Sequence, residues 1–189
     1  EKIVKILVID DSDMHRAAAK AQFKDHDLTV VGTYDDGQGL VREKHEFEVV
    51  LVDLLMPPSN QCMGPRMRHF VGDEMPVGIF LALLAAKNGA KFVAVFTDSD
   101  HHSHQASACF DAFNASETCP TPFTVEGAKV FLSNTRNWVE QFDPQDLSRA
   151  LEYQEYSQRS DTVRAKNWGK LLDYMTGKED HQPRSVFKP

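Results

Sequence analysis

The stretch Ile6-Leu7-Val8-Ile9-Asp10-Asp11 (residues 6–11) decides the fold, because four consecutive apolar residues end in two aspartates. A run without polar alternation is typical of a strand that is buried on both faces of a parallel sheet. The same design recurs four times further along the chain, at residues 30–31, 49–52, 92–96 and 130–132. Stretches of helical length separate these runs. The pattern therefore predicts an α/β protein with a doubly wound, five-stranded parallel sheet and helices on both faces.

Four helices are expected between these strands. The first is capped by Ser12 or Asp13, and the second covers residues 38–45. The third covers residues 77–87 and ends at Asn88-Gly89, a pair that favours helix termination. The fourth covers residues 102–113.

We expect one domain over residues 1–158, with long loops at 57–76 and 114–126, followed by a C-terminal helical extension over residues 159–189. Within the domain, Asp143-Pro144 is typical of a helix start. A further helix, capped near Ser160, presents an apolar stripe formed by Val163, Trp168, Leu171, Leu172 and Met175. The stripe predicts packing against the domain's own flank, and the alternative is a homodimer through the C-terminal helices.

The composition of the 189 residues limits the classes of function. The formal net charge of −7 argues against indiscriminate binding to nucleic acids or to anionic membranes. The longest apolar stretch, residues 77–86, is about half the length that a bilayer span needs. We expect no signal peptide at the start of the chain, and we interpret the three cysteines as reduced thiols. These features predict a cytoplasmic protein.

Acidic and hydroxyl side chains stand where the predicted strands end. Asp10 and Asp11 follow the first strand, Asp53 follows the third and Thr97 follows the fourth. Ligands of doubly wound sheets bind at this edge, where the carboxyl ends of the strands meet. Three carboxylates gathered there would repel one another unless a cation joined them, and oxygen ligands of this kind suit Mg²⁺. The alternative is that each aspartate only caps the helix that follows it.

Three segments together resemble the receiver domain of two-component response regulators, a CheY-like domain with a flavodoxin-like fold. They are residues 6–12, residues 93–97, and residues 49–57, which end in Asp53-Leu54-Leu55-Met56-Pro57. The resemblance covers about the first 155 residues. An acidic pair after the first strand combined with Asp-x-x-Met-Pro after the third is a specific pattern.

The resemblance implies roles for the residues at the sheet edge. Asp53 is the implied phosphoacceptor. Asp11 and Asp53 are the implied ligands of Mg²⁺, together with the carbonyl of Leu55, and Asp10 supports the metal through water. The implied switch residues are the hydroxyl of Thr97 and the aromatic ring of Phe131.

The chain departs from the receiver pattern at the fifth strand, which usually ends in a lysine. Alignment on the apolar run 130–132 places Asn134 at that position. A rival alignment on Phe142-Asp143-Pro144 places Glu140 there. Lys129 is unsuitable, because five residues of strand put it about 17 Å away. We therefore expect an atypical receiver without the usual lysine.

These observations predict a phosphorelay protein whose Asp53 receives a phosphoryl group from a histidine kinase or a phosphotransfer protein. Its signal is expected to pass through contacts with a downstream protein, without direct binding to DNA and without catalysis of its own beyond self-phosphorylation. One alternative is a pseudo-receiver that acts as a binding scaffold without phosphorylation. A second alternative is a haloacid-dehalogenase-like phosphatase that uses Asp11-Ser12-Asp13 as its nucleophile motif.

Overall fold

The computed structural model describes residues 3–59, 61, 70–99, 101–102, 104–115, 120–134, 138–142 and 163–178. Its strands are β1 (Lys5–Ile9), β2 (Asp27–Val31), β3 (Val49–Val52), β4 (Phe92–Phe96), β5 (Phe123–Val125), β6 (Ala128–Ser133), β7 (Val139–Phe142) and β8 (Val163–Lys166). Its helices are α1 (Asp13–Gln22), α2 (Tyr34–Val41), α3 (Gly78–Lys87), α4 (Gln105–Ala108), the 3₁₀ helix η2 (Cys109–Ala112) and α6 (Trp168–Thr176). Within these residues, no helix has the length and apolar character needed to cross a membrane.

Six strands form one sheet in the order β2-β1-β3-β4-β6-β5. The five strands β2, β1, β3, β4 and β6 run parallel, and they contain the five apolar runs of the sequence. An α/β fold with a mostly parallel sheet is therefore confirmed. The sixth strand, β5, pairs antiparallel with β6 and lies in a segment expected to be a loop. The two residues that join β5 to β6, Glu126 and Gly127, both have positive φ, which is the geometry of a tight hairpin turn.

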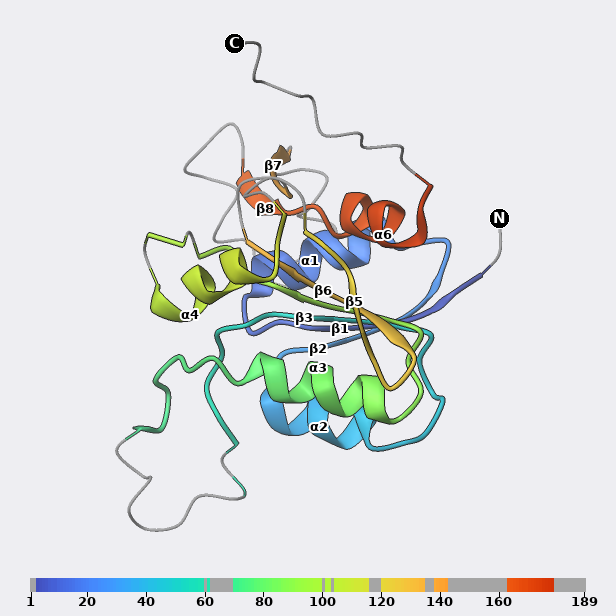
Figure 1. The fold of residues 1–189 in the computed structure, drawn as a ribbon, viewed down its shortest axis with the longest axis horizontal. Helices are drawn as coiled ribbons and strands as arrows, with labels where there is room; N and C mark the ends of the chain where they lie inside the picture. Colours follow the sequence, from blue (N-terminus) through green and yellow to red (C-terminus); the bar gives the residue numbers. More distant parts are fainter. Residues whose placement is uncertain are drawn as a thin grey trace.

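Side chains of each central strand alternate between two apolar clusters. Leu7 and Ile9 of β1 pack in a cluster with residues of α2 and α3, whereas Ile6 and Val8 pack in a second cluster with residues of α1 and α6. Figure 1 shows α2 and α3 on one side of the sheet and α1 and α6 on the other. The sheet is thus an apolar layer whose polar residues are displaced to the ends of the strands.

The helices differ from the expectation mainly in their bounds. α2 begins four residues earlier than predicted, because the hydroxyl oxygen of Thr33 accepts a hydrogen bond from the backbone N–H of Asp36 and caps the helix there. α3 ends before Asn88, as predicted. The expected fourth helix is shorter than predicted and is divided into α4 and η2.

The C-terminal part of the chain corrects one prediction and confirms another. The helix start expected near Ser160 lies outside the described residues, but Val163, which was expected in that helix, belongs to β8, and β8 pairs with β7 in a separate two-stranded sheet. α6 begins at Trp168, where the side chain of Asn167 accepts a hydrogen bond from the N–H of Lys170. Its apolar stripe is buried against the domain's own flank, as expected, through Trp168, Leu171, Leu172 and Met175. The helix predicted at residues 143–144 lies outside the described residues.

Candidate functional site

Two buried carboxylates lie side by side at the carboxyl edge of the parallel sheet. Asp10 directly follows β1 and Asp53 directly follows β3, and these two strands are neighbours. The backbone N–H of Asp53 donates to the carbonyl of Ile9 at 2.8 Å, which extends the ladder between the strands to the site. Asp10 is fully buried and Asp53 is 5% exposed. Buried carboxylates are costly unless a cation and hydrogen bonds compensate their charge.

Lys166 supplies that cation. Its Nζ lies 2.6 Å from Oδ2 of Asp10 and 2.6 Å from Oδ1 of Asp53, and its side chain is fully buried. The ammonium also lies 5.3 Å from the ring centroid of Phe96 and 5.2 Å from that of Trp168, within reach of cation–π attraction. The alignments on Asn134 and Glu140 therefore did not identify the lysine that reaches the acidic edge, which comes from β8.

Helix α1 fixes the position of Lys166 through both backbone and side-chain contacts. The N–H of Lys166 donates to Nδ1 of His15 at 3.4 Å, and its carbonyl accepts from Nε2 of Gln22 at 3.0 Å. The indole N–H of Trp168 donates to the carbonyl of His15 at 2.9 Å. The N–H of Gly169 donates to Oε1 of Gln22 at 2.8 Å. The start of α6 and the end of β8 are thus anchored on one helix, which directs the lysine toward the carboxylates.

The remaining carboxylate oxygens accept hydrogen bonds from backbone N–H groups. The N–H of Ser12 donates to Oδ1 of Asp10 at 2.9 Å, and the N–H of Leu55 donates to Oδ2 of Asp53 at 3.1 Å. The guanidinium of Arg16 donates to the carbonyl of Asp10 at 2.7 Å. Each carboxylate therefore has one oxygen on the ammonium and the other on the backbone, which fixes its orientation.

Burial and neighbouring charges shift the pKa values of the acidic and basic groups at this edge. Burial raises the pKa of Asp53 to about 7, with Lys166 opposing this rise and Asp10 adding to it. Burial also lowers the pKa of Lys166, but the charges of Asp10 and Asp53 outweigh burial and raise its net pKa above the ordinary value. Burial, followed by the charges of Asp10 and Glu74, raises the pKa of Asp11. Lys166 thus bonds two of the three carboxyl groups, and its charge acts on the third, Asp11, without a hydrogen bond.

Thr97 and Asn134 follow their strands at the same edge, whereas Phe131 lies in the middle of β6, and all three contact other groups. Thr97 directly follows β4 and is fully buried, and its Oγ1 accepts from the N–H of Ser99 at 3.1 Å. Phe131 lies in β6 and belongs to the apolar cluster that contains residues of α1 and α6. The centroid of its ring is 6.0 Å from that of Tyr174. Asn134 follows β6 and is buried, yet the residue that binds the carboxylates is Lys166.

Neither of the two positions that alignment gave for the lysine, Asn134 and Glu140, is the position of the residue that bonds the carboxylates. Glu140 lies in β7, which pairs with β8 and not with the main sheet. Asn134 follows the strand after which the lysine was expected, but the ammonium comes from β8, 32 positions later in the chain. The sequence contains a pattern that predicts a strand before Lys166, although the segment was interpreted as a helix. Val163-Arg164-Ala165-Lys166 alternates apolar and basic residues, as a strand does, and Asn167 is a good helix cap.

The sequence predicts a magnesium ion at this edge of the sheet. Within the described part of the chain, no three His, Cys, Asp or Glu side chains are placed together as ligands of one metal ion. Mg²⁺, however, is typically bound by one or two carboxylates with a carbonyl and water. A magnesium site formed by Asp11, Asp53 and the carbonyl of Leu55 therefore stays a prediction.

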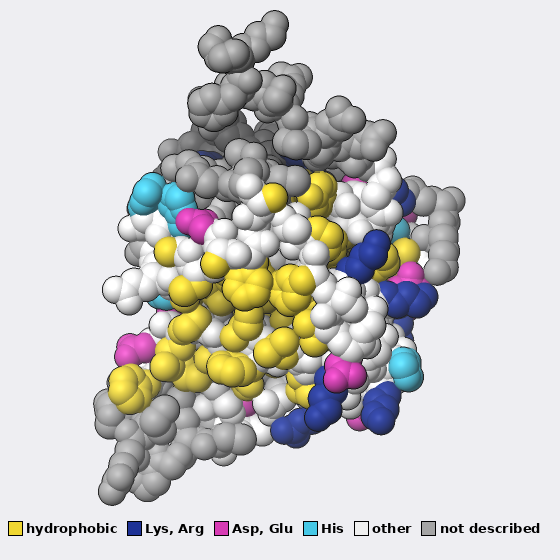
Figure 2. Space-filling view, viewed as in Figure 1, with side chains coloured by type: hydrophobic (Ala, Val, Ile, Leu, Met, Phe, Trp, Pro, Cys, Tyr) yellow, Lys and Arg dark blue, Asp and Glu magenta, His cyan; other side chains and the backbone are white. Residues whose placement is uncertain are grey.

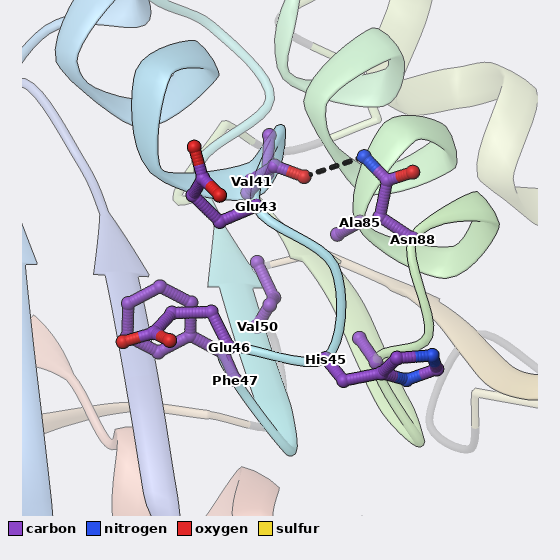
Figure 3. A pocket seen from close by; sticks show the side chains of 9 residues that line it. Val41, Glu43, His45, Glu46, Phe47, Val50, Ala85 and Asn88 are labelled. Atoms are coloured by element: carbon purple, nitrogen blue, oxygen red, sulfur yellow. Dashed lines mark hydrogen bonds between the residues drawn. The ribbon is translucent and has the colours of Figure 1, made fainter.

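A hollow lies at the opposite, amino-terminal edge of the sheet, and Figure 3 shows it from close by. Its lining comes from the end of α2, the end of α3 and the segments before β3 and β4, and includes His45, Glu46 and Phe47. Nδ2 of Asn88 donates to the carbonyl of Val41 at 2.7 Å and joins the two helices across it. The hollow is far from Asp10 and Asp53, because it lies where the strands begin.

The chain matches no protein-family model, no curated protein and no solved structure.

Proposed function

We propose that this chain is an atypical receiver domain with a doubly wound, flavodoxin-like fold, in which Asp53 accepts a phosphoryl group. The observation that supports it is the ammonium of Lys166 held 2.6 Å from both Asp10 and Asp53. The parallel strands follow the order β2-β1-β3-β4-β6, and in sheets with this order ligands bind at the carboxyl edge. This geometry supports the assignment of Asp53 as the nucleophile and Lys166 as the cation at the edge where ligands of such sheets bind.

Each residue at the carboxyl edge has its own role in the proposed phosphoryl transfer. Asp53 is the nucleophile, since a carboxylate is competent for phosphoryl transfer once negative charge around it is compensated. Lys166 stabilises the negative charge of the transferred group, and it keeps its proton at neutral pH because two carboxylates face it. Thr97 offers a hydroxyl one strand away for a hydrogen bond to the phosphoryl oxygens. When bound by Asp11, Asp53 and the Leu55 carbonyl, Mg²⁺ compensates the charges of nucleophile and donor.

The donor that this proposal implies is a histidine kinase or a histidine phosphotransfer protein, and the receiver of the signal is a downstream protein. Lys166 links the site to α6, because Trp168 lies two residues further on and is buried in the cluster that contains Phe131. A phosphoryl group that attracts the ammonium away from Asp10 changes the contacts at the start of α6. This is a route from the site to the surface of the protein.

A phosphorylation-independent scaffold is the alternative that one observation favours. Asp53 is only 5% exposed, so a donor reaches it only after the edge opens. In this reading, the Lys166 ion pairs hold the C-terminal elements in place and the site carries out no transfer.

The phosphatase alternative has weaker support. Asp13 belongs to the first turn of α1, where its carboxylate is exposed and pairs with Arg16. Lys166 binds Asp10 and Asp53 and forms no hydrogen bond with Asp11 or Asp13. The Asp11-Ser12-Asp13 motif therefore lacks the directly bonded lysine that its proposed chemistry needs.

Incubation of the full chain with Mg²⁺ and a small phosphodonor tests the proposal. We expect intact mass spectrometry to detect addition of one phosphoryl group, and Asp53→Asn to abolish it. Asp13→Asn is the matched control, because this carboxylate lies outside the edge, and it should be modified like the wild type. Unmodified, folded wild-type protein at saturating donor would contradict the proposal and favour the scaffold.

A further inference from the structure

Helix α3 has an outer face that is unusually apolar for an exposed helix. Its sequence, Gly-Ile-Phe-Leu-Ala-Leu-Leu-Ala-Ala-Lys, has one charged residue, Lys87, at its end. Leu81, Ala82, Ala85 and Ala86 are buried against the sheet, whereas Phe80 is 60% exposed and Leu83 is 43% exposed. A helix that is apolar all round is normally covered on all sides.

The exposed face of α3 continues onto a neighbouring aromatic pair. Phe113, 50% exposed, lies 5.4 Å from Phe123 of β5, centroid to centroid, and β5 contacts α3. Figure 2 shows hydrophobic side chains gathered in one continuous area on this side of the molecule. At 150–250 Å² for an aromatic side chain, Phe80 and Phe113 alone leave roughly 200 Å² of apolar surface open. With Leu83 the area reaches the few hundred Å² at which such surfaces mark interaction sites.

The charges around this face differ at the two ends of α3. The exposed residues Asp73 and Glu74 precede the helix, and the charge of Glu74 acts on Asp11, which places it near the carboxyl edge of the sheet. Lys87 ends the helix at the opposite edge. The ten residues of α3 span about 15 Å, so its exposed apolar residues lie between an acidic pair that precedes the helix and a lysine at its end.

This pattern is complementary to itself. A two-fold axis perpendicular to α3 near Leu83 brings two copies of the helix together antiparallel. The acidic pair of each copy then faces Lys87 of the other, and the two helix dipoles are opposed. Phe80 and Leu83 of both copies meet in the centre, where interface energy is concentrated. A parallel arrangement would instead set like charges against each other.

From this geometry we propose that the chain forms a homodimer through α3, with the two helices antiparallel. The proposal is independent of the chemistry at Asp53. It differs from dimerisation through the C-terminal helices, because the apolar stripe of α6 is already buried.

Sedimentation velocity of the full chain over a range of concentrations is the first test. We expect a monomer–dimer equilibrium that Phe80→Glu weakens about thirtyfold or more, since it places a charge in the centre of the interface. Ile3→Glu is the matched control: Ile3 is 69% exposed, lies before β1, and should dimerise like the wild type. If Phe80→Glu is unfolded by circular dichroism, Leu83→Gln replaces it. A wild type that is monomeric at all concentrations, or a dimer that neither substitution weakens, would overturn the proposal.

Two further variants test the antiparallel arrangement. Lys87→Glu should weaken the dimer about tenfold, and adding Asp73→Lys and Glu74→Lys to the same chain should restore it. In a chain whose Cys62, Cys109 and Cys119 are replaced by Ser, Leu83→Cys should form an intermolecular disulfide, because position 83 lies near the axis. Ile3→Cys in the same background should remain reduced. Failure of the charge exchange together with failure of the Leu83→Cys crosslink would reject the two-fold geometry.

Discussion

Lys166 and Lys91 both pair with carboxylates at the borders of the same sheet, and the comparison between them separates two kinds of ion pair. Lys166 lies at the carboxyl edge, fully buried, with Asp10 and Asp53 each 2.6 Å away. Lys91 lies at the amino edge, where its 63% exposed side chain meets Glu48 at 2.9 Å. The geometry of the two contacts is similar, but the surroundings differ.

Burial makes the partners of Lys166 dependent on it. In water, a carboxylate that loses its lysine is solvated again, so an exposed pair contributes about 0–1 kcal/mol. In the protein interior, a carboxylate that loses its lysine stays desolvated, and removal of one partner costs about 3–5 kcal/mol. Lys166, Asp10 and Asp53 therefore form a single unit in which each residue stabilises the others. The exposed pair of Lys91 and Glu48 can lose one partner at little cost in stability.

The largest expected effect follows from breaking this unit. Lys166→Met should lower the free energy of unfolding by about 3–5 kcal/mol at neutral pH, since it leaves Asp10 and Asp53 buried without a cation. Urea denaturation followed by circular dichroism measures the loss. Lys91→Met is the matched control, and its loss should remain within about 1 kcal/mol. Equal losses in the two variants would show that burial does not distinguish the two ion pairs.

The sequence allowed the acidic half of this unit to be predicted, but not the basic half. Asp10 and Asp53 follow apolar runs directly, and parallel strands bring their carboxyl ends together whatever the loops do. Lys166 is 113 positions away from Asp53 in the sequence, and no local pattern predicts with which strand the segment of Lys166 pairs. Its neighbours Val163, Trp168 and Met175 fit a helical stripe, and that periodicity concealed a short strand. Tertiary pairing with β7 and contacts with α1 decided the outcome.

The same reasoning explains which parts of the fold were predictable. The five parallel strands each contain an apolar run of two to five residues, and they were identified from these runs alone. β5 was not, because its three residues are only partly buried and its pairing depends on the turn at Glu126 and Gly127. Elements that are stabilised mainly by their own hydrophobic pattern are predictable, and elements that are stabilised by a single turn or cap are not.

An intermediate effect is expected where α1 anchors the lysine. Trp168→Phe removes the indole N–H that donates to the His15 carbonyl at 2.9 Å and reduces the volume of a fully buried ring. We expect a loss of about 1–3 kcal/mol in the free energy of unfolding, from the missing hydrogen bond and the space left behind. Tyr174→Phe, which loses only a partly buried hydroxyl bonded to the Pro120 carbonyl, should lose less. The reverse order in thermal or urea denaturation would contradict the role of Trp168 as the anchor.

Asp98 offers an ion pair of intermediate exposure. Its Oδ2 lies 3.2 Å from Nε2 of the buried His15, whose other ring nitrogen accepts from the N–H of Lys166. The hydrogen bond with His15 lowers the pKa of Asp98 below its usual value of 3.8, with the charges of Lys166 and His15 acting in the same direction and burial opposing them. This carboxylate belongs to the same anchor but keeps half of its side chain in water, so its contribution should be small.

The smallest effect is a pH-dependent one whose sign follows from that lowered pKa. Between the folded and the unfolded pKa of Asp98, the unfolded chain binds the proton and the folded chain does not, so the contribution to stability is present above about pH 4 and is lost as the pH falls through the folded value. Asp98→Asn should therefore cost about 0.5–1 kcal/mol at neutral pH, a figure that allows for solvent screening, and the difference from the wild type should shrink below pH 4. Urea denaturation at several pH values measures it, with Asp25→Asn, an exposed carboxylate after α1, as the control. A difference that stays constant down to pH 2, or grows there, would mean that Asp98 stabilises the anchor by something other than its charge.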